Sequence, residues 1–422
     1  CSPALLLTSA AKANALVDPA HAFAGTRVVV DANDAPPWAA LLTEEEREGP
    51  ASADPDAPAI LLYTSGSTGR PKGIVQTQRS LCDGARIVAG YLELGPKDHV
   101  AAVLPLSFDY GLNQVMAAAY AGARVTLASY LTAGELLRTL ARESITGLAG
   151  VPEIWVDLIA ALGSGAVPCD ALRAWRYATN SGGRLPERVI RFVHEHLPWV
   201  GLFAMYGLTE AFRSSFVPPG ELASRPRSIG KAMPEVTLLV VDPATGREVP
   251  HGVAGELVHC GACVARGYWN RDADTAKRFR GDPRPGHAGE TCVWTGDLAR
   301  RDEDGWLELV GRSDEQIKVD GHRISPDEVV EVVRAVDGVR SAAAVGVPMG
   351  PDDLTSLAVA VVPGDATVDG LAIAERVKSE CKRRLPPWMV PSLVRVLDAL
   401  PRTPNQKIDL AALRAWFAEG GR

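Results

Sequence analysis

Short apolar runs that alternate with helical stretches place the strongest constraint on how this chain can fold. Runs typical of buried strands recur through the first 150 residues, and helical stretches follow at Leu136–Leu140 and Ile154–Leu162. Strands that alternate with helices favour α/β layers around a largely parallel sheet. The strand-like runs are Ala4–Leu7, Arg27–Val30, Ile60–Tyr63, Val100–Leu104 and Arg124–Leu127.

The pattern changes near Ser228, where short strands separated by Asp, Gly and Pro turns begin. We therefore expect a small β-rich subdomain over residues 228–312, with strands at Val236–Val241, Gly255–His259 and Trp306–Leu309. With the α/β layers before it, this subdomain makes up an expected large N-terminal domain over residues 1–312.

A charged, turn-like passage, Arg312–Gln316, leads into an expected small α+β domain over residues 313–422. Its first helix should begin with Ser325 as N-cap and Pro326 at the first position, and Glu328 should complete a capping box. The remaining expected elements are strands at Ala342–Val347 and Leu357–Val362 and a helix at Asp369–Arg384.

Composition and charge exclude several classes of protein. Lys and Arg number 44 against 51 Asp and Glu, and no basic cluster is long enough to track a nucleic-acid backbone, so we expect no nucleic-acid partner. The apolar run Ala4–Leu7 is too short for a signal peptide or a membrane span, which favours a cytoplasmic protein with no membrane partner. The seven scattered cysteines favour reduced thiols over disulfides, and Cys260 and Cys263 form a lone CxxC without a second pair at zinc spacing.

Residues 63–73, Tyr-Thr-Ser-Gly-Ser-Thr-Gly-Arg-Pro-Lys-Gly, are the most informative stretch of the chain. Glycines let backbone N–H groups turn toward an anion, hydroxyls add short donors, and Lys72 supplies a positive charge. The pattern predicts a polyphosphate-binding loop, which we expect to lead directly into a helix after Gly73. The spacing does not match GxxxxGK[ST], so an ordinary P-loop is disfavoured. A flexible Gly/Ser linker is the structural alternative.

Further motifs follow in order along the chain, and together they resemble the adenylate-forming superfamily. That superfamily includes acyl-CoA synthetases, adenylation domains of nonribosomal peptide synthetases, and luciferases. Residues 104–114 and 206–213 further resemble the AMP-dependent acyl-CoA ligases of the exosortase-associated type. The motifs are residues 63–73, Tyr206-Gly-Leu-Thr-Glu210, Thr295-Gly-Asp297, Gly311-Arg312, Lys318 with Gly321 and Arg323, and residues 400–407.

The resemblance implies an ATP-dependent, AMP-forming ligase that activates a carboxylic acid as an acyl-adenylate. The acyl group would then pass to the thiol of coenzyme A or to the phosphopantetheine of an acyl or peptidyl carrier protein. Thr209 would contact the α-phosphate, and Glu210 would bind Mg²⁺, a hard cation that takes oxygen ligands. The residues implied to bind the β- and γ-phosphates are Thr64, Ser65, Gly66, Ser67, Thr68, Gly69 and Lys72.

The same resemblance implies a binding site for the nucleoside. Asp297 would accept hydrogen bonds from both ribose hydroxyls, since a carboxylate can accept from two neighbouring donors. Arg312 would lie beside the ribose and phosphate, and Tyr206, followed by Gly207, would stack on adenine. The segment implied to line the edge of the base consists of Ser181, Gly182, Gly183 and Arg184.

The resemblance implies that Lys407 catalyses adenylation. In the superfamily, a lysine on a C-terminal loop bridges the carboxylate of the acid and the α-phosphate. The chain has Gln406 where glycine is usual, so the geometry of this loop is an open question. Asp314 would be the hinge about which a mobile C-terminal domain turns, after which the segment Lys318–Arg323 would replace Lys407 in the site.

Asp109 lies where amino-acid-activating relatives place the carboxylate that pairs with the substrate ammonium. The same Ser107-Phe108-Asp109 triplet also occurs in the exosortase-associated ligases, so an amino acid and another small carboxylic acid both remain candidates. Tyr110, Asn113, Ser181 and Met205 are further candidate pocket residues, and they indicate a mid-sized, partly polar cavity.

The chain begins at Cys1 in a strand-like run, and we expect a start inside a domain whose first part was cleaved, trimmed or supplied as a separate chain. Two alternative functions remain open at this point. The first is an enzyme competent in one half-reaction, suggested by Gln406, and the second is a nucleotide-binding module without turnover.

Overall fold

The computed structural model describes residues 5–8, 26–29, 54–64, 72–312, 317–319, 322–349, 354–365, 369–403 and 407–420. The chain divides into two compact units, Cys1–Asp54 and Pro55–Arg422. In the first unit, strand β1 (Leu5–Thr8) pairs in parallel with β2 (Thr26–Val29), each within one residue of its predicted run. Asp314 and the loop residues Ser65, Gly66, Ser67, Thr68 and Gly69 lie outside the described residues.

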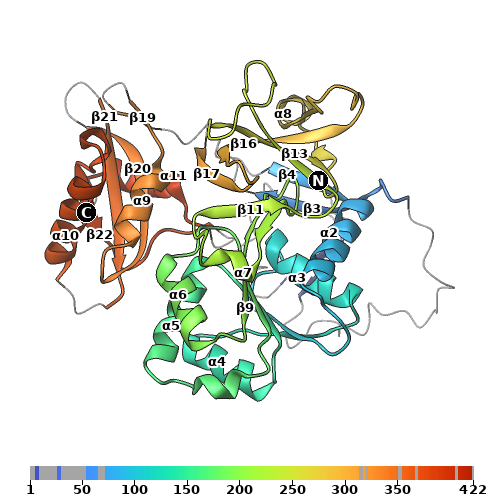
Figure 1. The fold of residues 1–422 in the computed structure, drawn as a ribbon, viewed down its shortest axis with the longest axis horizontal. Helices are drawn as coiled ribbons and strands as arrows, with labels where there is room; N and C mark the ends of the chain where they lie inside the picture. Colours follow the sequence, from blue (N-terminus) through green and yellow to red (C-terminus); the bar gives the residue numbers. More distant parts are fainter. Residues whose placement is uncertain are drawn as a thin grey trace. The chain divides into compact units, whose positions relative to one another are not determined.

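Five parallel strands form one half of the large sheet of the second unit (Figure 1). Their order is β9-β8-β7-β5-β6, so the expected parallel α/β layer is confirmed. The strands are β5 (His99–Ala102), β6 (Arg124–Leu127), β7 (Gly147–Gly150), β8 (Tyr177–Asn180) and β9 (Gly201–Tyr206).

Antiparallel strands continue the same sheet from β9, because β10 pairs with β9 and β11 pairs with both β10 and β17. The expected β-rich region is therefore hydrogen-bonded to the parallel half without a break. Its strands are β10 (Ser215–Val217), β11 (Ser228–Ala232), β12 (Val236–Val241), β13 (Gly255–Gly261), β15 (Phe279–Gly281), β16 (Thr291–Arg301) and β17 (Leu307–Arg312), with a short helix α7 (Pro219–Leu222).

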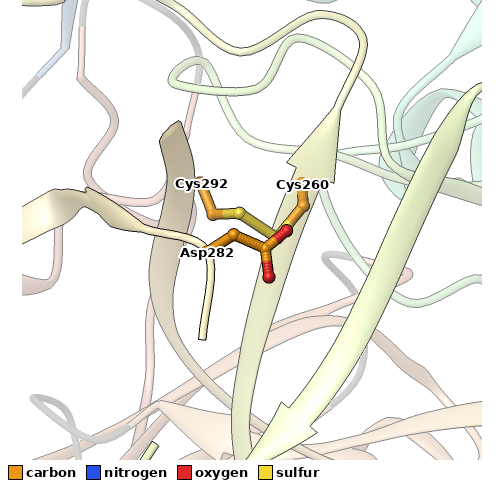
Figure 2. Close-up of side chains that lie close together, drawn as sticks. All are labelled: Cys260, Asp282 and Cys292. Carbon is orange, nitrogen blue, oxygen red and sulfur yellow. A yellow bond between two sulfur atoms is a disulfide. The ribbon is translucent and has the colours of Figure 1, made fainter. Parts of the chain in front are cut away.

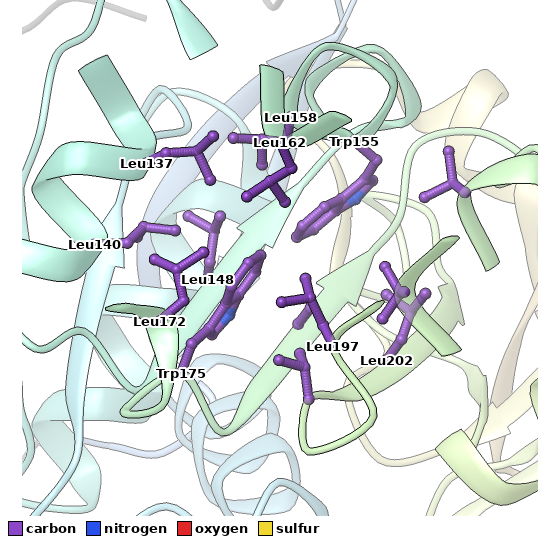
Figure 3. Packing of buried hydrophobic residues seen from close by; sticks show 14 of the residues in the cluster. Leu137, Leu140, Leu148, Trp155, Leu158, Leu162, Leu172, Trp175, Leu197 and Leu202 are labelled. Carbon is purple, nitrogen blue, oxygen red and sulfur yellow. The ribbon is translucent and has the colours of Figure 1, made fainter. Parts of the chain in front are cut away.

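Two layers of helices bury the two faces of the parallel strands. Leucines of α4 and α5 pack with the stacked rings of Trp155 and Trp175, whose centroids lie 6.2 Å apart, in the largest apolar cluster (Figure 3). Residues of α2 and α3 pack with Ala149, Tyr177 and Met205 in a second cluster. The helices are α2 (Gln78–Tyr91), α3 (Asp109–Tyr120), α4 (Ala133–Arg142), α5 (Pro152–Gly163), the 3₁₀ helix η3 (Cys169–Leu172) and α6 (Glu187–His196).

A three-stranded sheet carries the predicted phosphate loop. Strand β3 (Pro58–Thr64) pairs antiparallel with β4 (Lys72–Thr77), which pairs with β14 (Gly267–Tyr268), and helix α8 (Asp272–Arg278) follows β14. The expectation of a helix directly after Gly73 is wrong. Gly73 lies in β4, and α2 begins only at Gln78, because the return strand must pair with β3 before the chain can leave the hairpin.

The C-terminal elements gather around one small sheet of order β20-β21-β22, drawn in orange to red in Figure 1. Helix α9 begins at Pro326 with Ser325 as N-cap, as predicted, but the expected capping box is absent, because the Ser325 hydroxyl makes no cap hydrogen bond. The elements are β18 (Ile317–Val319), β19 (His322–Ile324), α9 (Pro326–Arg334), β20 (Val339–Met349), β21 (Leu354–Pro363), α10 (Gly370–Arg384), the 3₁₀ helix η4 (Pro387–Met389), β22 (Leu393–Val396) and α11 (Leu410–Ala418).

The expectation of reduced cysteines fails at one pair, Cys260 and Cys292, which form a disulfide (Figure 2). The two residues lie directly opposite each other on β13 and β16 with Cα atoms 4.4 Å apart, a separation that a disulfide can span. Spacing along the sequence could not reveal this pair, because strand register creates it. The other cysteines that the structure describes are free thiols: Cys82, Cys169, Cys263 and Cys381.

Within the described part of the chain, no helix is both long enough and apolar enough to cross a bilayer.

Candidate active site

The ends of the predicted phosphate loop face each other across the β3–β4 hairpin, where Thr64 pairs with Lys72. Lys72 is held from a distant part of the chain. Its Nζ lies 3.4 Å from a carboxylate oxygen of Asp274 on α8 and 5.1 Å from the ring centroid of Tyr268. The cation that the sequence predicted for phosphate binding is thus placed by β14 and α8, which follow it by about two hundred residues.

Glu210 joins the same group of side chains. Its Oε1 accepts a hydrogen bond of 2.6 Å from the Tyr268 hydroxyl and lies 3.9 Å from Nε of Arg278. Burial, followed by the charge of Glu210, raises the pKa of Tyr268, so this phenol stays protonated and donates. Thr209 is buried, and its carbonyl accepts 2.6 Å from Gln76 Nε2 of β4. The candidate metal ligand and the candidate phosphate cation therefore both contact Tyr268.

Tyr206 at the end of β9 and Asp297 on β16 meet, although β10, β11 and β17 lie between these strands in the sheet order. The Tyr206 hydroxyl donates a 2.5 Å hydrogen bond to Asp297 Oδ2, and Asp297 is paired with Arg312 in the register of β16 and β17. Burial raises the pKa of Tyr206, the charge on Asp297 adds to the rise, and Arg278 opposes it. Arg278 likewise opposes the rise in the pKa of Tyr268. The side chain of Arg312 lies outside the described set.

The segment after β8 turns sharply at Gly182, whose φ of +79° favours glycine. The Gly183 carbonyl accepts a hydrogen bond of 2.9 Å from Asn180 Nδ2, and Ser181 is buried. Arg184 forms an ion pair with Glu331 of helix α9. Its charge is therefore compensated by the C-terminal region, a partner that the sequence did not indicate.

A small cavity of ≈ 20 Å³ lies between α2, α3 and the parallel strands. Three of the predicted acid-binding residues, Tyr110, Asn113 and Met205, line it, whereas Asp109 and Ser181 do not. The Tyr110 hydroxyl is hydrogen-bonded at 2.6 Å to Thr179 Oγ1, which also lines the cavity. Gln114 also lines the cavity, and the remaining lining is mostly apolar.

Arg213 is one of the candidate site residues that the sequence interpretation missed, as are Tyr268, Asp274 and Arg278. In the sequence Arg213 is only the residue after the Tyr206–Phe212 motif, yet it is 2% exposed and its Nη1 lies 4.0 Å from Asp109 Oδ2. Its guanidinium lies 4.6 Å from the ring centroid of Tyr110. A charged residue directly after the apolar pair Ala211-Phe212 was the available signal, but its burial depends on the tertiary packing.

Lys407 is exposed, and its Nζ lies 5.4 Å from the ring centroid of Phe108, the residue before Asp109. Its carbonyl accepts a hydrogen bond of 2.8 Å from Thr403 N. Residues 404–406, Gln406 among them, are not among the described ones. The C-terminal cation thus lies next to the segment that begins α3 and the candidate acid pocket.

Among the described residues, two groups of three side chains could hold a metal ion. Both groups include Asp282, and neither includes Glu210. Figure 2 shows Asp282 beside the disulfide of Cys260 and Cys292, whose sulfurs are committed to each other. Asp282 also pairs with Arg284 at 2.5 Å, and this pairing lowers the pKa of its carboxyl group. These contacts account for the first group, and in the second group His287 Nδ1 lies 3.0 Å from Glu290 Oε1.

Comparison with known proteins gives consistent matches along the chain. The AMP-binding enzyme family matches residues 1–269, and the AMP-binding enzyme C-terminal domain matches residues 328–407. Phenyloxazoline synthase MbtB of Mycobacterium sp. (strain MCS) is 32% identical over 93% of this chain and 34% of its own length. A dimodular nonribosomal peptide synthase of Bacillus subtilis (strain 168) is 33% identical over 85% of this chain and 15% of its own length. The chain thus spans about a third or less of these relatives.

Solved structures agree with these matches. An ATP-bound RpMatB-BxBclM chimera superposes with a TM-score of 0.85 at 25% identity, covering 99% of this chain and 80% of its own. A benzoate CoA ligase from Burkholderia xenovorans LB400 has a TM-score of 0.82 at 26% identity, covering 97% and 79%. None of these matches supports the prediction that a separate chain supplies an N-terminal segment. The predicted likeness to the exosortase-associated ligases stays a prediction. Family match, relatives and fold agree, and this chain belongs to the AMP-binding enzyme family of the adenylate-forming superfamily.

Proposed function

We propose that this chain is an ATP-dependent, AMP-forming ligase that adenylates a small carboxylic acid and transfers the acyl group to a thiol. The observation that carries the proposal is the meeting of Lys72, Tyr268 and Glu210 from three distant segments. Tyr206, four residues before Glu210, connects this group to Asp297. The relatives include a peptide synthase and the structures include a CoA ligase, so coenzyme A and a carrier-protein phosphopantetheine are both candidate acceptors.

The described residues fit a triphosphate. Arg278 Nε is buried and has no hydrogen-bond partner among the described residues, although it lies beside Glu210. A buried unsatisfied donor is costly, and an anionic oxygen would satisfy it. Glu210 would hold Mg²⁺, which supplies charge neutralisation on the phosphates.

In the first half-reaction, a carboxylate oxygen of the acid attacks the α-phosphorus, the bond to the bridging oxygen breaks, and pyrophosphate leaves. Lys72 and the hydroxyl-rich loop at residues 64–69 would bind the β- and γ-phosphates, and Thr209 the α-phosphate. Lys407 would place its ammonium between the two reacting anions. Positive charge at that point lowers the repulsion between carboxylate and triphosphate, which is the main electrostatic obstacle to the step.

Asp297 would bind the ribose hydroxyls, with Arg312 beside it. Tyr206 and the Gly182–Arg184 segment would bind adenine. In the second half-reaction a thiolate attacks the acyl carbon, and AMP leaves with the electron pair of the broken C–O bond. The small domain over residues 313–422 would turn about Asp314 between the two steps, which requires the Arg184–Glu331 ion pair to open.

The test is ATP–pyrophosphate exchange with a panel of amino, aryl and short-chain acids. Lys407→Ala should reduce exchange by about a hundredfold or more, the scale expected for loss of one transition-state charge contact. Lys382→Ala, an exposed lysine of α10, is the matched control and should leave exchange unchanged. Acid-dependent products on coenzyme A and on a phosphopantetheinylated carrier protein, measured by mass, then identify the acceptor. Absence of exchange with every acid, in a folded sample that binds ATP, would contradict the proposal.

A further inference from the structure

A strained turn places Arg213 in the interior. Phe212 has a φ of +54°, rare for a bulky residue, and the Arg213 N–H donates 2.6 Å to the Ala211 carbonyl across it. Such a γ-turn with positive φ at its centre is uncommon and strained. Phe212 is fully buried, and a Cβ added to Gly84 would lie 2.5 Å from its ring. Strain of this kind persists where the surrounding structure enforces it and concentrates at functional sites.

Arg213 is positioned but not satisfied. Its Nη1 donates 2.6 Å to the Phe212 carbonyl and lies 4.0 Å from Asp109 Oδ2, and its guanidinium lies against the ring of Tyr110. Its Nε and Nη2 are buried and have no hydrogen-bond partner among the described residues. Nε and Nη2 form the edge of a guanidinium that can donate side by side to acceptor oxygens.

Two amide side chains of α3, one turn after Asp109 and Tyr110, also lack hydrogen-bond partners in the described part of the chain. Asn113 Nδ2 and both polar atoms of Gln114 are buried without hydrogen bonds within the described ranges, and both residues line the cavity with Tyr110. Four of these five unpaired atoms, counting Nε and Nη2 of Arg213, are donors. Buried polar groups are almost always satisfied in native proteins, so a ligand or water that brings acceptors is expected here.

Asp109 and Arg213 do not line this cavity, but both contact Tyr110, which does, and this charged pair limits which ligand can bind beside it. Asp109 and Arg213 are 5% and 2% exposed and compensate each other. An ammonium group added beside them would leave a net positive charge buried, and a second carboxylate would leave a net negative one. An uncharged oxygen acceptor keeps the balance, and an uncompensated buried charge is strongly unfavourable.

We infer that the acid of this enzyme carries an uncharged oxygen acceptor, such as a hydroxyl, oxo or amide oxygen, which Arg213 binds, and that Asp109 serves as the counter-ion of Arg213. The inference rests on the proposed ligase function and narrows its substrate class. It also separates Asp109 from the ammonium-binding role that the sequence suggested.

The test measures kcat/KM for pyrophosphate exchange with carboxylic acids of three to six carbons. Each unsubstituted (plain) acid is compared with the hydroxy, oxo, amino and dicarboxylic acids of the same chain length. A hydroxy or oxo acid should exceed both the plain and amino acids by about tenfold or more, as expected for hydrogen bonds to a charged donor. Arg213→Met should remove that preference. Asp109→Asn leaves the positive charge of Arg213 uncompensated and should shift the preference toward dicarboxylic acids.

Arg213→Lys retains the charge but not the two-donor edge, and it decides the question if Arg213→Met does not fold. It should lose most of the preference while ATP binding is kept. An amino acid as best substrate, with exchange abolished in Asp109→Asn, would overturn the inference and leave the ligase function standing. No exchange with any acid in a folded, ATP-binding protein would overturn both.

Discussion

Replacing His259 should change how the stability of this protein depends on pH. His259 on β13 is fully buried, its Nε2 is 2.8 Å from the Ala262 carbonyl, and its Nδ1 is 2.9 Å from Ser214 Oγ. A carbonyl only accepts, so Nε2 carries the proton and Nδ1 accepts from the Ser214 hydroxyl. Burial lowers the pKa of this imidazole from 6.5 to about 4. The folded protein therefore resists a proton that the unfolded chain takes up readily.

Linkage sets the sign and size of the effect on stability. The stabilising contribution of the neutral imidazole is complete above pH 6.5, falls as the unfolded state binds its proton, and levels off below about pH 4. Each pKa unit is about 1.4 kcal/mol, so the shift amounts to about 3 kcal/mol of unfolding free energy lost across this interval.

Urea unfolding of the unaltered protein and of His259→Gln, at pH values from 4.5 to 7.5, measures the effect. The difference in unfolding free energy between the two proteins should shrink by about 2 to 3 kcal/mol as the pH falls through this range. His251→Gln, in an exposed turn, is the control for loss of a histidine as such. A difference that stays constant with pH would refute the assignment of a buried, neutral His259.

Two further predictions concern packing and the disulfide. Gly147→Ala should lower the unfolding free energy by about 1 to 3 kcal/mol through overpacking, since its Cβ would lie 2.1 Å from the Tyr177 ring. Thermal unfolding measures this loss of stability. Gly163→Ala is the neutral control, because the space around Gly163 is open. Replacing Cys260 and Cys292 together by Ala should cost about 3 to 4 kcal/mol under oxidising conditions, from closure of a loop with a sequence separation of 32. Alkylation of both thiols without reductant in the folded, unaltered protein would show that the disulfide does not form.

Local patterns in the sequence determined much of the fold. The strands Arg124–Leu127 and Val236–Val241 have the predicted bounds, and the helix predicted at Asp369–Arg384 spans Gly370–Arg384 with Asp369 as its cap. These elements follow from side-chain period and capping residues, which act over a few positions. The family resemblance likewise rests on ordered motifs that can be read without coordinates.

Contacts between distant segments were decided by the tertiary structure alone. Nothing in the sequence indicated that Arg213 would lie against Asp109, or that Tyr268 would connect Lys72 to Glu210. The disulfide between β13 and β16 depends on strand register in the same way. Which side chains meet is set by sheet order and by the packing of helices on it, since those contacts are separated by tens to hundreds of residues along the chain.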